Sequence, residues 1–265
     1  MAEERLELNE RGLPPVRRAL VIMAHPDDPE FFVGGTIGLL AEQGTEVRVL
    51  LVTDGSKGSD DRALSTRELI RLRREEQREA TRRLGALDVI FFDYPDGELR
   101  HEPNVLRDVV RELRRFQPEM VLTNDPQRFY YESGYINHTD HRTIGAIVID
   151  AVFPAARNFR YFPALLEEGF EPWYVRELWL AAPLEANHEV NTDTTAETRL
   201  QAILAHTSQV GDGTWIRERF AEMREKGEPL LEKFKRIELG GPPQQSDEEP
   251  PKDHAEAKLE ASEEG

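Results

Sequence analysis

Two short stretches of the chain carry side chains that could bind a metal ion and move protons. Residues 19–30 read ALVIMAHPDDPE, so an apolar run leads directly into His25, Asp27 and Asp28. Adjacent carboxylates at the end of a buried strand repel each other and lose hydration, so they need a compensating partner. The second stretch, NHTDHR at residues 137–142, adds two histidines and another aspartate.

The types and spacing of these residues suit metal coordination. His138 and His141 are three residues apart at the start of a predicted helix, so both imidazoles can project from one face. The sequence contains no cysteine, so any bound metal must be held by histidine and carboxylate ligands. A His/Asp/His set suits Zn²⁺ or Fe²⁺ and leaves one or two positions for water. Taken alone, the paired aspartates have a simpler alternative explanation, because either could cap the following helix.

These residues can meet only if the fold brings the ends of two strands together. Apolar runs alternate with helical periodicity through the first half of the chain, which is typical of parallel strands joined by helices. We predict strands at residues 19–24, 46–53, 87–93 and 119–124, and helices at about 34–43, 66–84, 104–116 and 143–153. This order predicts an α/β fold, a Rossmann-like and mostly parallel sheet with helices on both faces. Ligands bind beyond the carboxyl ends of such strands, where both histidine-containing stretches fall.

The second half of the chain continues the α/β pattern less regularly. We predict strands at 174–183 and 188–193, and helices at about 195–208 and 215–234. The predicted organisation is an N-terminal extension (1–17), a single domain (18–240) and an acidic tail (241–265). The tail has four prolines, eight acidic residues, two lysines and no aromatic residue, so it cannot build a core and is predicted to be disordered.

Composition narrows the range of partners. The chain has 34 Lys and Arg against 51 Asp and Glu, a formal net charge of -17. This balance argues against nucleic-acid and anionic-membrane partners, because both need a basic surface. The sequence has neither a run approaching the ~18 apolar residues of a membrane span nor the apolar core of a signal peptide. We therefore expect a cytoplasmic protein, or one without a recognisable export signal.

The four loops at the predicted strand ends resemble the signatures of one enzyme family. AHPDDPE at 24–30, TDGSKG at 53–58, YPDGEL at 94–99 and NHTDHR at 137–142 are similar in order and spacing to the motifs of PIG-L/LmbE-like deacetylases. That family includes N-acetylglucosaminyl-phosphatidylinositol deacetylases and enzymes of the mycothiol and bacillithiol pathways. The resemblance extends over roughly residues 18–210 and implies a zinc-dependent amidohydrolase on a Rossmann-like fold.

The resemblance also implies a metal site and a base. His25, Asp28 and His141 match the metal ligands of the family, with Zn²⁺ as the expected ion and Fe²⁺ as an alternative. Asp27 matches the general base that takes a proton from the metal-bound water. Such a water can reach a pKa near ~7, which makes it a nucleophile at neutral pH.

Three other residues complete the implied catalytic set. His138, partnered by Asp140, matches the cationic group that stabilises the oxyanion or protonates the leaving amine. Histidine suits that role because its charge changes close to neutral pH. Arg73 falls at the family's basic position on the second predicted helix, where the resemblance implies that it shapes the site or contacts substrate.

Substrate contacts are expected from three further positions. Asp96 is either a turn residue or a carboxylate in the cleft, and Tyr135 is part of either a stacking wall for a sugar or a packed lid. His206 resembles a family position at the substrate end of the cleft, although a histidine near a helix C-terminus is also a common structural choice. Ile136 stands where the mycothiol deacetylase pattern has a tyrosine, so no catalytic tyrosine is transferred to this chain.

Three functions are compatible with these residues. The first is a metal-dependent deacetylase that cleaves the amide of an N-acetylglucosamine-type small molecule. The second is an amidase acting on thiol S-conjugates or another small amide. The third is a non-catalytic module that binds a metal or sugar, which the complete set of ligands, base and acid disfavours. The resemblance also makes a homo-oligomer an expectation.

Overall fold

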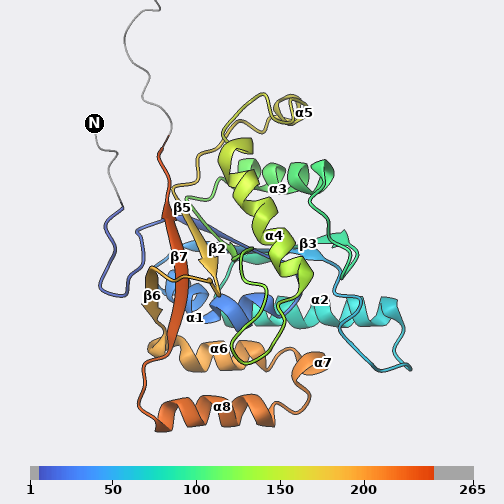
Figure 1. Cartoon of the computed structure of the whole chain (residues 1–265), viewed down its shortest axis with the longest axis vertical. Helices are drawn as coiled ribbons and strands as arrows, with labels where there is room; N and C mark the ends of the chain where they lie inside the picture. The colour runs from blue at the N-terminus through green and yellow to red at the C-terminus, as the bar shows by residue number, and fades with distance from the viewer. Residues whose placement is uncertain (1–5, 242–265) are drawn as a thin grey trace, which may run out of the picture.

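Residues 6–241 are described by a computed structural model, in which they form a seven-stranded sheet between two layers of helices (Figure 1). The strands are β1 (Arg18–Met23), β2 (Glu46–Thr53), β3 (Asp88–Tyr94), β4 (Met120–Asn124), β5 (Glu177–Ala181), β6 (His188–Asn191) and β7 (Leu231–Glu238). The helices are α1 (Asp28–Glu42), α2 (Thr66–Arg83), α3 (Pro103–Phe116), α4 (Thr139–Asp150), α5 (Ala164–Glu167), α6 (Ala196–Ile203), α7 (Thr207–Val210) and α8 (Thr214–Glu225). A π-helical turn spans Ala151–Ala155 and a 3₁₀ turn spans Asp193–Thr195.

The sheet has the order β3-β2-β1-β4-β5-β7-β6. The first five strands in this order pair in parallel, and β7 is antiparallel to both β5 and β6. The predicted α/β fold with a mostly parallel sheet is therefore confirmed. Parallel neighbours end at the same edge of the sheet, so the loops after β1 and β4 open toward each other.

The helices cover both faces of the sheet because the strand residues alternate between two cores. Leu20 and Ile22 of β1 pack in one apolar cluster with α3 and α4, whereas Val21 and Met23 pack in the other with α1. Figure 1 shows α3, α4 and α5 on one side of the sheet and α1, α2 and α6 on the other, with α8 outermost. A third cluster, which includes Phe220, joins α8 to α6.

Two helices begin earlier than the sequence predicts. Helix α1 starts at Asp28, six residues before the predicted start at 34, and α4 starts at Thr139 instead of 143. Pro29 occupies the first turn of α1, where its missing N–H leaves no intrahelical bond unmade. Asp27 and Asp28 at the start of α1, and His141 in the first turn of α4, are therefore held by helical backbone, which limits their conformational freedom.

The prediction of a helix over 215–234 is wrong in its second half. Helix α8 ends at Glu225, and the chain returns as strand β7. In β7, Glu232 and Phe234 are buried while Leu231 and Lys233 are exposed, which is the period of a strand. Charged residues on the exposed side give this stretch the appearance of a charged helix. The helix predicted at 195–208 is also divided, into a 3₁₀ turn, α6 and α7.

The segment before β1 contributes to the core. Leu13 and Val16, within the predicted extension, are buried in the same cluster as Val21. The predicted acidic tail, residues 241–265, lies outside the described residues except for Gly241. Of the helices formed by residues 6–241, none is both long and apolar enough to cross a membrane.

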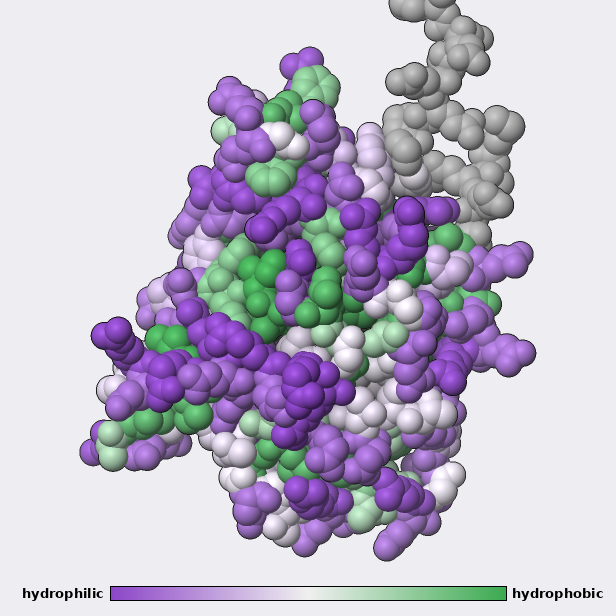
Figure 2. All heavy atoms as spheres, turned by 180° about the vertical axis from the view of Figure 1, so that it is seen from behind, coloured by the Kyte–Doolittle hydropathy of each residue, from purple (hydrophilic) through white to green (hydrophobic). Residues whose placement is uncertain are grey.

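Strand β3 forms one free edge of the sheet. Its burial is mostly intermediate, and Leu87 just before it is 57% exposed. Figure 2, which views the molecule from behind, shows hydrophobic residues at mid-height. Figure 1 draws β3 at this height, between α3 and α2. The guanidinium groups of Arg74 and Arg78 lie 5.2 and 5.1 Å from the ring centre of Phe91, so charged side chains partly cover the edge.

Gly145 allows α4 to approach the end of β4. A Cβ at this position would overlap the backbone oxygen of Asn124 and lie 3.1 Å from Pro126. We expect Gly145→Ala to lower the free energy of unfolding by about 1–3 kcal/mol, because the close packing leaves no room for a methyl group. Urea denaturation measures this change. Thr143→Ala, at a half-buried position of the same helix, is the control and should change the free energy of unfolding by less than about 1 kcal/mol. Equal destabilisation by the two substitutions would contradict the close packing inferred at Gly145.

Candidate metal centre and active site

The adjacency of β1 and β4 brings together two histidines that are far apart in the sequence. His25 follows the end of β1, and His141 lies in the first turn of α4, which follows β4. Nδ1 of His25 and Nε2 of His141 are 3.2 Å apart. The two motifs therefore meet at the carboxyl edge of the sheet, where an α/β fold places its ligands.

Asp28 completes a compact group of three metal-ligand types. Its Oδ1 lies 3.1 Å from Nε2 of His141, and its Oδ2 lies 3.4 Å from Nδ1 of His25. One donor atom from each residue lies within 4.8 Å of the others. His25, Asp28 and His141 are 7%, 5% and 5% exposed, so water screens these groups weakly.

The hydrogen-bond network fixes which nitrogen of His141 faces the centre of this group. Nδ2 of Asn137 donates to the carbonyl of Arg128 at 2.7 Å, so the amide oxygen of Asn137 points the other way. That oxygen lies 2.9 Å from Nδ1 of His141, which must then carry the proton. Nε2 of His141 consequently presents a lone pair to Asp28 and His25.

A cation fits the centre of this group because its facing atoms are acceptors. Burial opposes ionisation of Asp28, but the charges and hydrogen bonds of His141 and His25 hold the pKa of its carboxyl well below the usual range. Burial also lowers the pKa of His25, but hydrogen bonds to Asp140, Asp28 and Asp96 raise it overall, so the surrounding carboxylates favour a positive charge here, which a bound cation would supply in place of a proton on Nδ1. Two imidazoles and a carboxylate with converging lone pairs form a donor set that suits Zn²⁺ or Fe²⁺.

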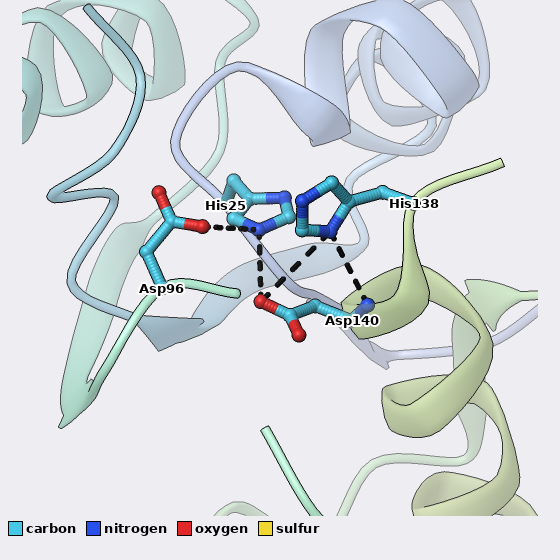
Figure 3. A group of neighbouring side chains, drawn as sticks. All are labelled: His25, Asp96, His138 and Asp140. Atoms are coloured by element: carbon cyan, nitrogen blue, oxygen red, sulfur yellow. Dashed lines mark hydrogen bonds and ion pairs between the residues drawn. The ribbon is translucent and has the colours of Figure 1, made fainter. Parts of the chain in front are cut away.

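The second nitrogen of His25 is held by two carboxylates (Figure 3). Nε2 lies 3.2 Å from Oδ1 of Asp96 and 3.2 Å from Oδ2 of Asp140. The same carboxylate of Asp140 accepts hydrogen bonds from the amides of Gly97 at 2.6 Å and Leu99 at 3.3 Å. A proton shared with these carboxylates occupies Nε2 of His25 and leaves Nδ1 to face the candidate metal position.

The expected pairing of His138 with the carboxylate of Asp140 differs from what the structure shows. Nδ1 of His138 accepts a hydrogen bond from the backbone N–H of Asp140 at 3.2 Å, whereas the carboxylate is 3.9 Å away and bonds to His25 instead (Figure 3). Burial and the neighbouring His25 lower the pKa of His138, so Asp140 does not hold it cationic. With Nδ1 accepting, the neutral ring carries its proton on Nε2, and its side chain is 40% exposed.

Asp27 has an unusual backbone that is held from two sides. Its φ angle is 93°, in the left-handed region that non-glycine residues rarely adopt. The Asp27 N–H donates to Oε1 of Gln77 at 2.8 Å, and its carboxylate lies 3.5 Å from the guanidinium of Arg73. Burial and the adjacent Asp28 charge raise the pKa of the Asp27 carboxyl to about 6, although Arg73 acts in the opposite direction.

Arg73 is buried beside the site, a position that agrees with the first of its two expected roles, shaping the site. It is 3% exposed and donates to the backbone carbonyls of Pro26 at 2.7 Å and Gly55 at 2.8 Å. A Cβ at Gly58 would overlap the guanidinium, so the glycines of TDGSKG allow this loop to close around Arg73. This loop is the packing surface of a buried arginine.

His206 is buried and hydrogen-bonded within the structure, which agrees with the structural alternative given for it. The ring is fully buried, and its Nε2 lies 3.1 Å from Oε2 of Glu30. The other carboxylate oxygen of Glu30 accepts a hydrogen bond from Nε2 of Gln77 at 2.8 Å. Burial lowers the pKa of His206, but the Glu30 carboxylate raises it overall. A continuous buried chain, His206–Glu30–Gln77, thus ends on the strained backbone of Asp27.

The remaining two candidates, Asp96 and Tyr135, differ in their contacts and exposure. Asp96 combines both of its proposed roles: Oδ1 faces His25, while Oδ2 accepts the backbone N–H of Lys57 at 2.9 Å within a turn. Tyr135 is 59% exposed and lines a cavity with Phe31. Neighbouring Ile136 is 75% exposed.

The alternative explanation of the paired aspartates as helix caps is not supported. Asp27 is the N-cap residue of α1, but among the described residues its side chain caps no helical amide. The Asp28 carboxylate turns back and accepts the N–H of His25 at 2.8 Å. The Asp28 carboxylate therefore faces the site and that of Asp27 faces Arg73, and neither satisfies the start of the helix.

Comparison with known proteins places the chain in a family. The model of the PIG-L family, described as GlcNAc-PI de-N-acetylase, matches residues 20–152. Diacetylchitobiose deacetylase of Thermococcus kodakarensis is 32% identical over 201 residues, which cover 76% of this chain and 73% of that protein. The chain belongs to the PIG-L family.

Two further comparisons agree with this assignment. A probable N-acetyl-alpha-D-glucosaminyl L-malate deacetylase 2 of Bacillus anthracis is 29% identical, over 73% of this PIG-L protein and 81% of the relative. The solved structure of N,N'-diacetylchitobiose deacetylase from Pyrococcus horikoshii, complexed with its inhibitor MPG, superposes with a TM-score of 0.76 at 31% identity, over 84% and 85% of the two chains. The predicted family and fold are confirmed. Within this PIG-L chain, the matched range 20–152 contains both histidine motifs, whereas His206 lies outside it.

Proposed function

We propose that this PIG-L protein is a metal-dependent deacetylase that cleaves the N-acetyl amide of an N-acetylglucosamine-type substrate. The observation that carries the proposal is the convergence of three metal-ligand atoms, from His25, Asp28 and His141, next in the chain to Asp27, whose carboxylate is outside that group and lies 3.5 Å from Arg73. The names of the relatives support the acetylated amino sugar as the substrate class. We propose Zn²⁺ as the resident ion, with Fe²⁺ as the alternative.

The metal would be held by Nδ1 of His25, the Asp28 carboxylate and Nε2 of His141. When bound, it supplies Lewis acidity, which lowers the pKa of a coordinated water and polarises the acyl oxygen. The protein contributes a dry setting and the oriented ligands, because Asn137 fixes His141, and Asp96 with Asp140 fixes His25.

The proton transfers are assigned to Asp27 and His138. Asp27 accepts a proton from the water as its oxygen attacks the acyl carbon, and Arg73 keeps the resulting carboxyl group in place. Nε2 of His138, which carries the proton of the neutral ring, donates a hydrogen bond to the acyl oxygen as negative charge develops there. The C–N bond breaks when the amine takes up the proton held by Asp27, which releases acetate and the free amino sugar.

A substrate panel tests the proposed function. Purified protein loaded with Zn²⁺ is assayed for primary-amine release from N-acetylglucosamine, N,N'-diacetylchitobiose and a cysteinyl-amide S-conjugate. We expect amine and acetate in equal amounts from the acetylated sugars and no product from Asp27→Ala. Cleavage of the S-conjugate alone would favour the amidase, and absence of all turnover in protein with stoichiometric metal would favour a binding module.

Gln77 gives a separate prediction about the base. We expect Gln77→Leu to lower kcat about 10-fold with little change in KM, because the Asp27 N–H loses its acceptor while the substrate surface is unchanged. Steady-state kinetics on the best substrate of the panel measures both constants. Gln201→Leu, at an exposed position on α6, is the control. A change in KM alone would contradict the assigned positioning role.

A further inference from the structure

Helix α1 is interrupted shortly after the candidate ligand Asp28. The backbone of Val33 has φ -141° and ψ 16°, outside the helical range, so α1 consists of a short first segment, 28–32, and a longer second segment, 34–42. A break of this kind separates N–H groups at the start of the second segment from C=O groups at the end of the first. Most residues on both sides of the break are buried, so these groups need partners from elsewhere in the protein.

A carboxylate from strand β7 binds the N–H groups on one side of the break. Oε1 of Glu232 accepts the N–H of Gly35 at 2.8 Å, and its Oε2 accepts the N–H of Thr36 at 2.8 Å. Glu232 is only 4% exposed, and negative charge at the start of a helix is favourable. Glu232 therefore caps the second segment of α1 from outside the helix.

An arginine from α6 binds the C=O groups on the other side of the break. Nε of Arg199 donates to the carbonyl of Glu30 at 3.0 Å, and its Nη2 donates to the carbonyl of Phe31. Nη1 of Arg199 lies 3.2 Å from Oε1 of Glu232, so the two side chains form an ion pair. In an uninterrupted α-helix, the N–H of Gly35 would bond to the C=O of Phe31. The Arg199–Glu232 pair bridges this donor and this acceptor.

Two glycines allow the pair to approach the break closely. A Cβ at Gly35 would overlap the side chain of Thr192, and a Cβ at Gly34 would lie 3.1 Å from Cγ of Arg199. Thr195 adds a hydrogen bond from its Oγ1 to the carbonyl of Gly35 at 2.9 Å. Figure 1 shows α6 and the beginning of β7 beside α1. The guanidinium of Arg199 is therefore held directly against the break.

The first segment of α1 connects this pair to the metal centre. It carries Asp28 at its start and Phe32 at its end, and the Phe32 ring stands at 85° to the ring of His141 with centroids 5.4 Å apart. The two carbonyls that Arg199 holds belong to the second and third residues after Asp28. A rotation of this segment would therefore move the Asp28 carboxylate relative to His141.

We propose that Arg199 and Glu232 are positioning residues of the metal centre. Their ion pair holds the first segment of α1 at the angle that places Asp28 against the two histidine ligands. The proposal rests on the metal centre of the proposed function and extends it to the residues that hold the ligand-bearing segment. Both residues lie outside the range 20–152 that the family model matches, so the second half of the chain sets the geometry of a centre whose ligands lie in the first half.

Metal affinity tests this proposal. Glu232→Gln removes the charge but keeps the shape, and Arg199→Met keeps the apolar stem. Each should weaken Zn²⁺ affinity about 10-fold in competition with a chelator, because changes to groups that orient a ligand cost 10–100-fold. The double variant should bind no more weakly than the weaker single variant, since the two residues act as one unit. Wild-type affinity in both single variants would overturn the proposal.

A second buried ion pair on the same strand supplies the control. Glu177 is 1% exposed and pairs with Arg236 of β7 at 2.7 Å. Glu177→Gln should lower stability but keep wild-type metal affinity, and an equal loss of affinity in this variant would overturn the proposal. With Co²⁺ at saturation, the visible absorption bands should change in Glu232→Gln and Arg199→Met and stay unchanged in Glu177→Gln, because these bands report the geometry of the ligands.

Hydrogen exchange separates the pair from the metal. In metal-free protein, the amides of residues 28–36 should exchange at least 10-fold faster in Glu232→Gln and Arg199→Met than in wild type, and at the wild-type rate in Glu177→Gln. Faster exchange in the two variants would support the pair even if the wild-type protein bound no metal, a result that would refute only the metal centre. Equal exchange in wild type and both variants would overturn the pair whether or not the protein binds metal.

Discussion

Asp27→Asn should lower kcat by about three orders of magnitude while the protein keeps its metal and its fold. An amide of the same shape cannot accept the proton of the attacking water, and removal of a positioned general base costs typically 10²–10⁴-fold. The Asp27 backbone is held by Gln77 and the carboxylate by Arg73, so the substitution leaves the surrounding contacts largely intact. Single-turnover and steady-state rates on the best substrate measure the loss.

Metal analysis of the same variant supplies the control. Asp27 lies next to Asp28 in the chain, yet it does not belong to the group whose donor atoms converge. Metal content at the wild-type level together with the lost turnover would separate the base from the ligands. A kcat within about threefold of the wild-type value would contradict the assignment of Asp27 as the base.

Asp28→Asn, unlike Asp27→Asn, should lose metal: we expect its metal affinity to be at least 100-fold weaker than that of the wild type. Asp28 lies within reach of both histidines, and it provides the charged ligand of the set. Even changes to groups that only orient a ligand cost 10–100-fold in affinity, so loss of a ligand should cost more. Competition of the metal-loaded protein with a chelator of known affinity measures the change.

Asp27→Asn is the matched control for this experiment because it neutralises the adjacent carboxylate. If both variants weakened metal binding equally, the effect would come from the total negative charge of the loop and the ligand assignment would be wrong. If Asp28→Asn bound metal as tightly as wild type, the candidate centre itself would be refuted.

Much of the fold could be predicted because its signals are local. The strands β1, β2 and β4 are short apolar runs whose residues are buried on both faces, as in any covered parallel sheet. Strand β7 could not be predicted in this way. Its apolar residues Leu231, Phe234 and Ile237 recur at every third position among charged residues, as on a helix, and the strand period of its burial is seen only with its partners β5 and β6.

The candidate site could be predicted as a set of residue types but not as a network. The two histidine motifs are visible in the sequence, and the order of the strands implies that they meet. The partners of each group depend on side-chain directions that spacing does not determine. For this reason Asp140 was paired with His138, whereas its carboxylate reaches His25 and its backbone N–H reaches His138.

Two supporting residues were missed altogether. Gln77 lies four residues after Arg73 on α2, so the two share a helical face, whereas Asn137 lies four residues before His141 and precedes α4. An uncharged amide among charged neighbours is the only signal that the sequence offers for either residue. It indicates a buried hydrogen-bonding role only once the burial of these two residues is known.

The most direct test of the account is a metal titration of the reaction. Metal-free protein receives increasing amounts of Zn²⁺, and the rate of acetate release from N,N'-diacetylchitobiose is measured at each addition. We expect no turnover without metal and a rate that rises in proportion to bound Zn²⁺ until one equivalent is reached. Full activity in the metal-free protein, or a rate that does not depend on bound metal, would contradict it.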